Sequence, residues 1–201
     1  MRRFASVAAA IAIGLTVACT SALSNHAAKG PTLNEDIDAQ IAKDDAIVWA
    51  LRRPLAWADF KGPAPAEVGA VAAQTNYALL HGAGCTGSKF EFRVVAAFVP
   101  DKSWVRTSML RSPAESVRAL RHEQTHFDIA EVYARRMRQR FAEVYNPCGT
   151  SREALDTIAN RYITDEAGAQ ARYDDETRHG LTVARQRQWD ADVKRMLSGS
   201  D

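Results

Sequence analysis

The segment 121–128 reads Arg-His-Glu-Gln-Thr-His-Phe-Asp and contains the pattern His-Glu-x-x-His. On an α-helix, His122 and His126 lie one turn apart on the same face. Two neutral imidazole nitrogens at that spacing can bind one Zn²⁺ at about 2.0–2.1 Å. Glu123 follows the first histidine, where its carboxylate can reach a metal-bound water and act as a general base. The alternative is a polar helix face that carries two histidines by chance.

A long helix is predicted to carry this motif. Ser112, Pro113 and Glu115 combine an N-cap serine, a proline at the first helical position and a glutamate three residues after the cap. No glycine or proline follows before residues 146–147, so the helix is expected to span about 33 residues. Apolar residues at helical spacing predict its buried side, formed by Val117, Leu120, Phe127, Ala130, Ala134, Met137, Phe141 and Val144.

Two further helices are predicted after this one. A capping box over 150–153, with Thr150 as the cap, begins a second helix that extends to about Thr177, and Gly180 separates it from a third helix over 181–197. If the first two helices pack as an antiparallel hairpin, Gln124 lies level with about residue 172. The segment 173–179, Tyr-Asp-Asp-Glu-Thr-Arg-His, is therefore expected beside the motif.

A catalytic zinc site needs a third protein ligand and an open position for water. His179 is the predicted third ligand, because it stands before Gly180 at a helix end, from which its side chain can turn towards the metal. Glu176 is the alternative, and Asp174 or Asp175 also remain open as ligands. His179 could instead only cap a helix C-terminus, where the helix dipole favours its positive charge.

Two supporting roles are predicted for nearby side chains. Tyr173 is a candidate catalytic residue, because its hydroxyl could hydrogen-bond a developing oxyanion. The alternative for Tyr173 is a structural place in the buried core. Asp128 or Asp174 is expected to orient a ligand imidazole through its second ring nitrogen.

The region before the motif is predicted to form a small antiparallel sheet. Residues 68–80 are β-compatible, and 89–99 begin with a strict apolar–polar alternation, so two strands are expected with a hairpin turn at Gly82-Ala83-Gly84. Shorter extended pieces are expected over 54–63 and 103–106, and a short helix near 34–44. The predicted fold is α+β and zincin-like: a small sheet, then a long helical hairpin carrying the motif, then a third C-terminal helix. One domain is expected over 46–201, after a polar lead-in over 20–45.

The N-terminus has the pattern of an export signal. Arg2 and Arg3 precede an apolar run of about 15 residues, which is shorter than the roughly 20 needed to cross a bilayer. Residues 1–19 are therefore predicted to be a signal peptide, and the protein is expected in the periplasm or outside the cell. An imperfect lipoprotein box before Cys19 leaves a lipid anchor there as the one expected membrane attachment, although simple export is favoured.

Charge and cysteine content support this interpretation. The chain carries 26 Lys and Arg against 24 Asp and Glu, a formal net charge of +2. Arg2 and Arg3 account for the excess, so the rest of the chain is balanced and no nucleic-acid partner is expected. In an exported protein, Cys85 and Cys148 favour one disulfide between the segment before the motif and the turn after its helix. Two unrelated thiols are the alternative.

Several segments carry a resemblance to a known family. They are Leu-Ala-Trp-Ala-Asp-Phe-Lys-Gly at 55–62, Ser-Trp at 103–104, His-Glu-Gln-Thr-His-Phe-Asp at 122–128, Tyr-Asp-Asp-Glu-Thr-Arg-His-Gly at 173–180, and a Gln-x-x-Trp element at 186–189. With these segments the chain resembles a bacterial family of secreted zinc-dependent proteases, long catalogued as a domain of unknown function. The resemblance implies a metallopeptidase-like site at residues 122, 123, 126 and 179, and says little about substrate.

Together these observations predict an exported zinc-dependent metallopeptidase. His122, His126 and His179 are expected to bind Zn²⁺, with Glu123 as the general base for a metal-activated water. The expected substrate is a peptide or protein, with peptides of the cell wall among the possibilities. Two alternatives remain: a zinc-binding envelope protein without turnover, and an interaction protein built on the helical hairpin with no metal.

Overall fold

The computed structural model of the 201-residue chain describes residues 33–66 and 71–199. The predicted signal peptide, Cys19 and the first part of the lead-in lie outside the described residues. Among the helices that are described, none has the length and apolar character needed to cross a membrane. The main elements are α1 (Leu33–Lys43), β1 (Ile47–Val48), β2 (Ala73–Gln74), β3 (Tyr77–Thr86), β4 (Lys89–Phe98), β5 (Trp104–Val105), α2 (Pro113–Ala142), α3 (Arg152–Thr177) and α4 (Val183–Ser198).

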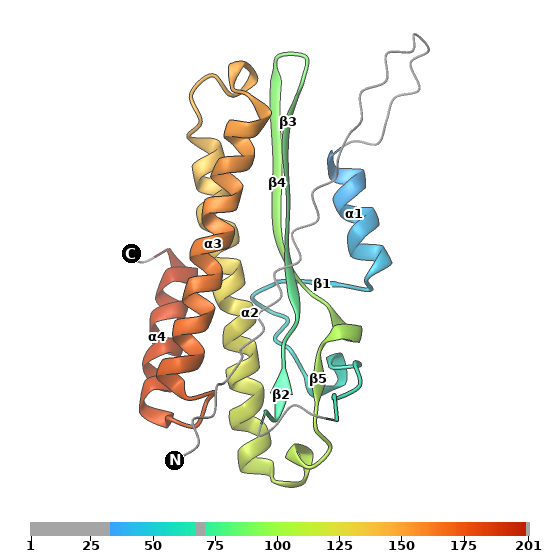
Figure 1. The fold of residues 1–201 in the computed structure, drawn as a ribbon, viewed down its shortest axis with the longest axis vertical. Coiled ribbons are helices and arrows are strands. Elements are labelled where there is room, and N and C mark those ends of the chain that lie inside the picture. The colour runs from blue at the N-terminus through green and yellow to red at the C-terminus, as the bar shows by residue number, and fades with distance from the viewer. Residues whose placement is uncertain (1–32, 67–70, 200–201) are drawn as a thin grey trace, which may run out of the picture.

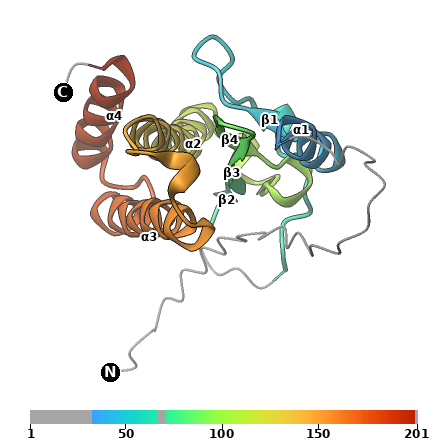
Figure 2. The same ribbon diagram turned by 90° about the horizontal axis from the view of Figure 1, so that it is seen from above.

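A long β-hairpin stands between helix α1 on one side and helices α2, α3 and α4 on the other (Figure 1). Strands β3 and β4 pair antiparallel from Tyr77 opposite Phe98 to Thr86 opposite Lys89, and β1 adds to the other edge of β4. Strands β2 and β5 form a separate two-stranded ladder. Helix α1 lies on one side of the hairpin, while α2 packs on the other side with α3 and α4 against it (Figure 2). The predicted α+β class is therefore confirmed.

The apolar face of α2 forms the centre of the core. Phe127, Ala134, Met137 and Phe141 are buried against the β-hairpin and the start of α3, which explains the apolar spacing along this helix. Val117 was predicted to belong to the same face, but its side chain is 70% exposed. A second cluster joins α2 to the other two helices and contains Ile129, Val132, Tyr133, Ala169, Tyr173 and Val193.

The predicted turn at Gly82-Ala83-Gly84 is wrong. These residues continue β3, and the chain turns later, at Gly87, which has a φ of +63°. A Cβ atom at Gly82 would lie 2.0 Å from Leu33 Cδ1, so the absence of a side chain there lets α1 approach the strand. The segment expected to be extended over 54–63 instead contains a short 3₁₀ turn at Trp57–Asp59.

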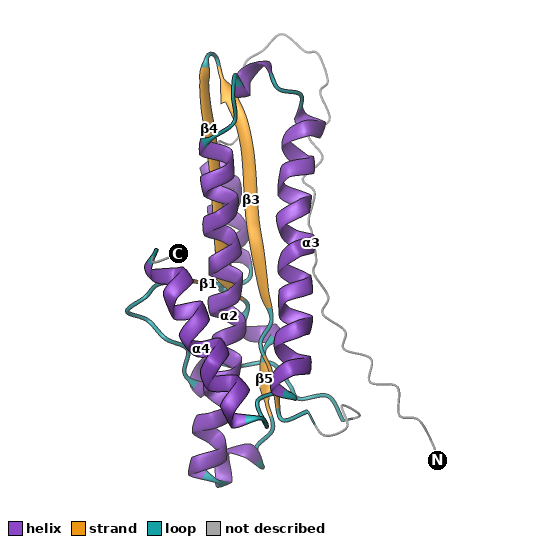
Figure 3. Cartoon of the chain, turned by 90° about the vertical axis from the view of Figure 1, so that its left-hand side faces the viewer, coloured by secondary structure: helices purple, strands orange, loops and turns teal. Residues whose placement is uncertain are grey.

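The helical hairpin is close to the prediction. Helix α2 ends at Ala142, a few residues before the predicted stop, and α3 is capped by Ser151 rather than Thr150, its hydroxyl accepting a hydrogen bond from Ala154 N at 3.2 Å. Cys85 and Cys148 form the expected disulfide, with a Cα–Cα distance of 5.7 Å. It ties the tip of the β-hairpin to the α2–α3 connection, which lie at the same end of the molecule (Figure 3).

Candidate metal centre

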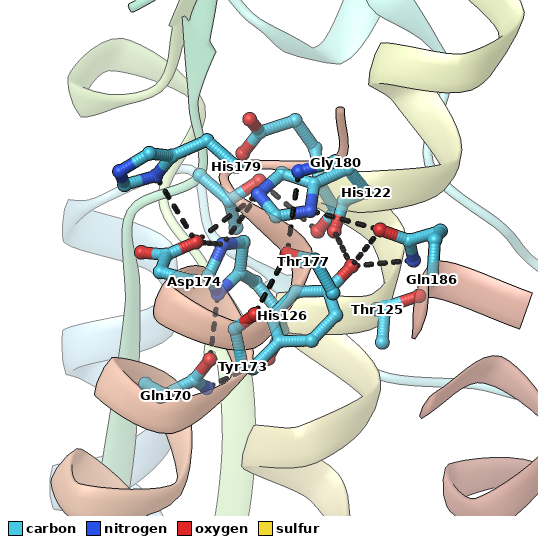
Figure 4. A network of polar contacts seen from close by, with 12 residues as sticks. His122, Thr125, His126, Gln170, Tyr173, Asp174, Thr177, His179, Gly180 and Gln186 are labelled. Carbon is cyan, nitrogen blue, oxygen red and sulfur yellow. Dashed lines mark hydrogen bonds and ion pairs between the residues drawn. The ribbon is translucent and has the colours of Figure 1, made fainter. Parts of the chain in front are cut away.

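The antiparallel packing of α2 and α3 brings the histidine motif beside the end of α3. The Tyr173 ring stacks on the His122 ring with centroids 4.7 Å apart and meets the His126 ring at 4.8 Å. His122 is 5% exposed, so the cluster lies inside the helical layer and not on a solvated face. The predicted juxtaposition of the motif with residues 173–179 is thus present in the structure (Figure 4).

Three atoms from this cluster form a small triangle. His122 Nε2 and His126 Nε2 are 3.2 Å apart, and Asp174 Oδ1 lies 3.1 Å from the first and 3.0 Å from the second. Ligands at about 2.0–2.1 Å from a tetrahedral zinc ion stand about 3.3–3.4 Å from one another. The triangle therefore has nearly the dimensions of one face of a zinc coordination shell.

Two glutamine side chains hold the other nitrogens of these imidazoles. His122 Nδ1 lies 3.1 Å from Gln186 Oε1, and His126 Nδ1 lies 2.6 Å from Gln170 Oε1. An amide oxygen can only accept, so each Nδ1 carries the proton. In the neutral imidazoles each Nε2 then has a free lone pair that points into the triangle, as a metal ligand requires.

When both imidazoles are neutral, the triangle consists of three hydrogen-bond acceptors without a donor. Asp174 Oδ1 is buried and makes no hydrogen bond of acceptable geometry, although the imidazole nitrogens are close to it. Burial alone would lower the pKa of His126, but the Asp174 carboxylate outweighs it and raises that pKa to about 9. Burial also acts to raise the pKa of Asp174, yet its contacts with both histidines hold that pKa well below its usual range. A proton or a metal cation among these atoms relieves their repulsion.

His179 borders the cluster from the solvent side. Its Nδ1 lies 3.4 Å from Asp174 Oδ1, and the side chain is 56% exposed. The ligand-competent atoms of His122, Asp174 and His179 all lie within 4.8 Å of one another. The structure thus brings His179, the predicted third ligand, to the cluster, but places Asp174 closest to the two histidines of the motif.

An unusual backbone turn presents His179. Arg178 and His179 have φ values of +51° and +54°, and Gly180 follows with +78°, so three successive residues are left-handed. Thr177 is fully buried, and its hydroxyl donates to Tyr173 O at 2.7 Å and accepts from Gly180 N at 3.2 Å. These contacts fix the turn directly after α3, which offsets the cost of left-handed non-glycine residues.

Glu123 is also buried, at 5% exposure, and its Oε2 has no hydrogen-bond partner. Its backbone is held from the sheet side, because the Thr75 hydroxyl donates to Glu123 O at 3.2 Å. A buried carboxylate oxygen without a partner costs folding free energy, and such groups are typical of functional sites. Glu123 therefore has the environment expected of a proton-accepting group beside the cluster.

Two predicted acidic candidates lie away from the cluster. The Glu176 carboxylate accepts a hydrogen bond from Trp189 Nε1 at 2.9 Å and pairs with Arg185, so it faces α4 and does not fit as the alternative ligand. Asp128 accepts from Trp49 Nε1 at 2.7 Å and from Gln124 Nε2 at 2.8 Å. Of the two residues predicted to orient an imidazole, Asp128 therefore contacts neither ring, because its helix position points it towards the segment before β2.

The contacts of Tyr173 do not support the oxyanion role predicted for it. The residue is completely buried, and its hydroxyl lies 3.1 Å from His122 O and 2.6 Å from Gln186 Nε2. Burial raises its pKa well above the usual range, so the hydroxyl stays protonated. Tyr173 supports the His122 ring from behind, as the alternative of a buried core tyrosine anticipated.

Sequence reasoning missed the two glutamines as site residues. Gln170 lies one helical turn before Asp174, and α3 therefore presents both on the face that meets α2. That spacing is the signal that could have identified Gln170. Gln186 had been noted only as part of a Gln-x-x-Trp element, and α4 carries it to His122 from the far side of the helical layer.

Comparison with known proteins gives one relationship. No curated protein and no solved structure matches the chain. One family profile, described as a bacterial protein of unknown function (DUF922), matches residues 49–180. The matched region extends from the segment before β2 to the glycine after His179 and ends before α4. It therefore contains His122, His126, Asp174 and His179. Because it covers well over half of the sequence, the chain belongs to this family of bacterial proteins, DUF922.

Proposed function

We propose that the protein is a zinc-dependent hydrolase of the peptidase type that works outside the cytoplasm. The observation that carries the proposal is the triangle of His122 Nε2, His126 Nε2 and Asp174 Oδ1, three atoms 3.0–3.2 Å apart. Two imidazoles and a carboxylate are a ligand set typical of catalytic zinc. The disulfide supports an oxidising compartment, as export through the predicted signal peptide would provide.

In this proposal Asp174 replaces His179 as the third ligand. Asp174 is nearer to both motif histidines and its Oδ1 lacks a hydrogen bond, whereas His179 is more than half exposed. The solvent side of the cluster then remains available for water and substrate. A zinc ion bound there would polarise a carbonyl oxygen and acidify a water molecule.

The remaining chemistry falls to Glu123. Its unpartnered Oε2 accepts the proton of the attacking water and later delivers it to the leaving amine. Gln170 and Gln186 keep both imidazoles oriented while this happens. The proposed substrate is a peptide or protein, with peptides of the cell wall included, and a lipid at Cys19 would place the site near the membrane.

The test uses protein purified without a histidine tag. We expect about one zinc per chain, and Asp174→Ala should lose it, while Asp175→Ala, at the exposed neighbouring position, should keep it. Glu123→Gln should retain zinc but lose hydrolysis of a broad peptide library by about 10³-fold or more. Glu115→Gln, exposed in the first turn of α2, is the matched control. Equal cleavage by the wild type and Glu123→Gln would contradict the mechanism.

A zinc-binding protein without turnover is the second candidate, and one observation favours it. His179 Nδ1 is close enough to Asp174 that a small rotation could add it as a fourth protein ligand, which would close the site. X-ray absorption of the zinc-loaded protein distinguishes the two. Loss of one nitrogen scatterer in His179→Ala supports the closed site, whereas an unchanged shell that contains a water oxygen supports the hydrolase.

A further inference from the structure

Each imidazole of the motif is connected to a carboxylate through a single glutamine. Gln170 Nε2 donates to Glu166 Oε1 at 2.6 Å, and Gln186 Nε2 donates to Asp190 Oδ1 at 2.7 Å. In both pairs the acid lies four residues from the glutamine on the same helix, before it on α3 and after it on α4. The two histidines thus have parallel chains of support from different helices, and Figure 4 shows the two glutamines on separate sides of the cluster.

The surroundings of Gln170 permit only one direction of its amide. Its Nε2 donates both hydrogens, one to Glu166 Oε1 and one to His126 O at 2.9 Å. If the amide were reversed, its oxygen would face these two acceptors and its NH₂ group would face His126 Nδ1. That arrangement exchanges two hydrogen bonds for two acceptor–acceptor contacts in a buried position, so the observed direction is strongly favoured.

The direction of the Gln186 amide is fixed by Asp190, because the Tyr173 hydroxyl can both donate and accept. Gln186 Nε2 donates to Asp190 Oδ1 at 2.7 Å and to the Tyr173 hydroxyl at 2.6 Å, and the residue is only 3% exposed. The hydrogen of the Tyr173 hydroxyl is then available to His122 O, 3.1 Å away, or to Gln186 Oε1, 2.9 Å away. With both amide hydrogens used, Gln186 Oε1 is the atom left to face His122 Nδ1.

The amide direction decides the tautomer of each histidine. With an amide oxygen opposite Nδ1, the neutral ring carries its proton there and leaves Nε2 as a lone pair. With an NH₂ group opposite Nδ1, the ring would place its proton on Nε2, in the middle of the triangle, where it would exclude a metal ion. The direction of the two glutamine amides therefore determines whether the Nε2 atoms can bind a metal ion.

From this arrangement we propose that Glu166 and Asp190 are positioning residues for the metal centre. By accepting from the glutamine amides they hold His126 and His122 in the Nδ1–H tautomer, so that both Nε2 atoms are ready for a cation. The effect on metal affinity rests on the zinc site proposed above, whereas the effect on the tautomers does not. Neither carboxylate touches the cluster, and both act through a glutamine.

The test removes each acceptor and then restores it. Glu166→Met and Asp190→Leu delete the carboxylate oxygens, while Glu166→Gln and Asp190→Asn each keep one oxygen that can accept from the glutamine. We expect about tenfold to 100-fold weaker zinc binding for the deletions, measured by competition with a chelator of known affinity, and near wild-type affinity for the amide variants. Asp165→Met and Asp192→Leu remove the same charge from the same helices and should leave the affinity unchanged.

A second measurement separates positioning from a structural role. The ¹⁵N shifts of the imidazoles are recorded on metal-free protein at a pH high enough for both rings to be neutral. Glu166→Met should shift His126 from the Nδ1–H towards the Nε2–H form and leave His122 unchanged, and Asp190→Leu should do the reverse.

Variants that unfold more easily but keep the Nδ1–H tautomers and the zinc affinity of their folded form would overturn the proposal. If the wild type binds no zinc, the zinc function fails, and the ¹⁵N shifts still decide whether the carboxylates set the tautomers.

Discussion

The two ends of the helical layer differ in the chemical character of their buried side chains. At the disulfide end, α2 and α3 meet the β-hairpin through apolar rings and aliphatic side chains, such as Phe92 against Phe141, with centroids 5.7 Å apart. At the other end, the buried side chains include a group of polar ones: His122, Glu123, Thr125, Glu166, Gln170, Thr177 and Gln186. The contrast separates a region that stabilises the fold from one that specifies a cluster of acceptor atoms.

The physical chemistry of the two ends differs accordingly. Apolar contacts are non-directional. Their loss therefore lowers the free energy of unfolding but does not change the direction in which a neighbouring polar group points. Buried polar networks contribute less net stability, but every donor and acceptor in them fixes the direction of another. Substitutions at the disulfide end should therefore change stability and spare the metal site, whereas substitutions at the polar end should mainly change metal affinity.

The largest stability effect is expected from Phe141→Ala. Phe141 is 2% exposed, and its truncation should lower the free energy of unfolding by about 3–5 kcal/mol through lost burial and a cavity. Urea denaturation measures this, and zinc affinity of the folded protein should stay within about twofold. Val117→Ala, on an exposed part of the same helix, should change stability by about 0.5 kcal/mol or less. A tenfold loss of zinc affinity in Phe141→Ala would show that the two ends are coupled.

Removal of the disulfide should have the next largest effect. Cys85→Ser with Cys148→Ser opens a loop with a sequence separation of 63 residues and should lower the free energy of unfolding by about 2–4 kcal/mol. Thermal unfolding of wild type with and without a phosphine reductant provides the matched comparison, because reduction should reproduce the double variant. Zinc content should be the same in all three samples. A reduced protein that loses its zinc while still folded would contradict the separation of the two ends.

The long helix and its apolar face were easier to predict from the sequence than the polar cluster. The seven-residue recurrence of Phe127, Ala134 and Phe141 reports burial on a helix, and the cap before Pro113 marks where that helix begins. The failures come from tertiary contacts that local patterns do not contain. Gly82 was interpreted as a turn, yet it is a strand residue against which Leu33 packs.

The sequence predicted where the polar cluster lies, but not which side chains contact the two histidines. The sequence predicts the lengths of α2 and α3 and the turn between them. Antiparallel packing of these two helices is enough to bring residues 173–179 to the motif. The sequence could not decide which of Asp174, Glu176 and His179 is nearest to the two histidines. That depends on which face of α3 packs against α2. The glutamines were missed for a related reason: an amide becomes a site residue only when a neighbouring helix delivers it to an imidazole.

The smallest predicted effect is that of an alanine substitution at Gly180, which tests whether the polar end depends on close packing around His122. Gly180 and Gly199 both have left-handed φ values, +78° and +71°, so alanine at either position should cost about 1 kcal/mol of stability. Only at Gly180 would the added Cβ meet another group, 3.1 Å from His122 Cβ and Cγ, whereas nothing lies within 4 Å of it at Gly199.

Gly180→Ala should therefore also displace the His122 ring and weaken zinc binding about tenfold, or about 1.4 kcal/mol. Gly199→Ala should share the loss in melting temperature and leave zinc affinity unchanged. Chelator competition on both variants, beside their melting curves, measures the difference. Equal zinc affinity in the two variants would mean that His122 can shift by a few tenths of an ångström without consequence, and that the cluster is less tightly specified than its hydrogen bonds indicate.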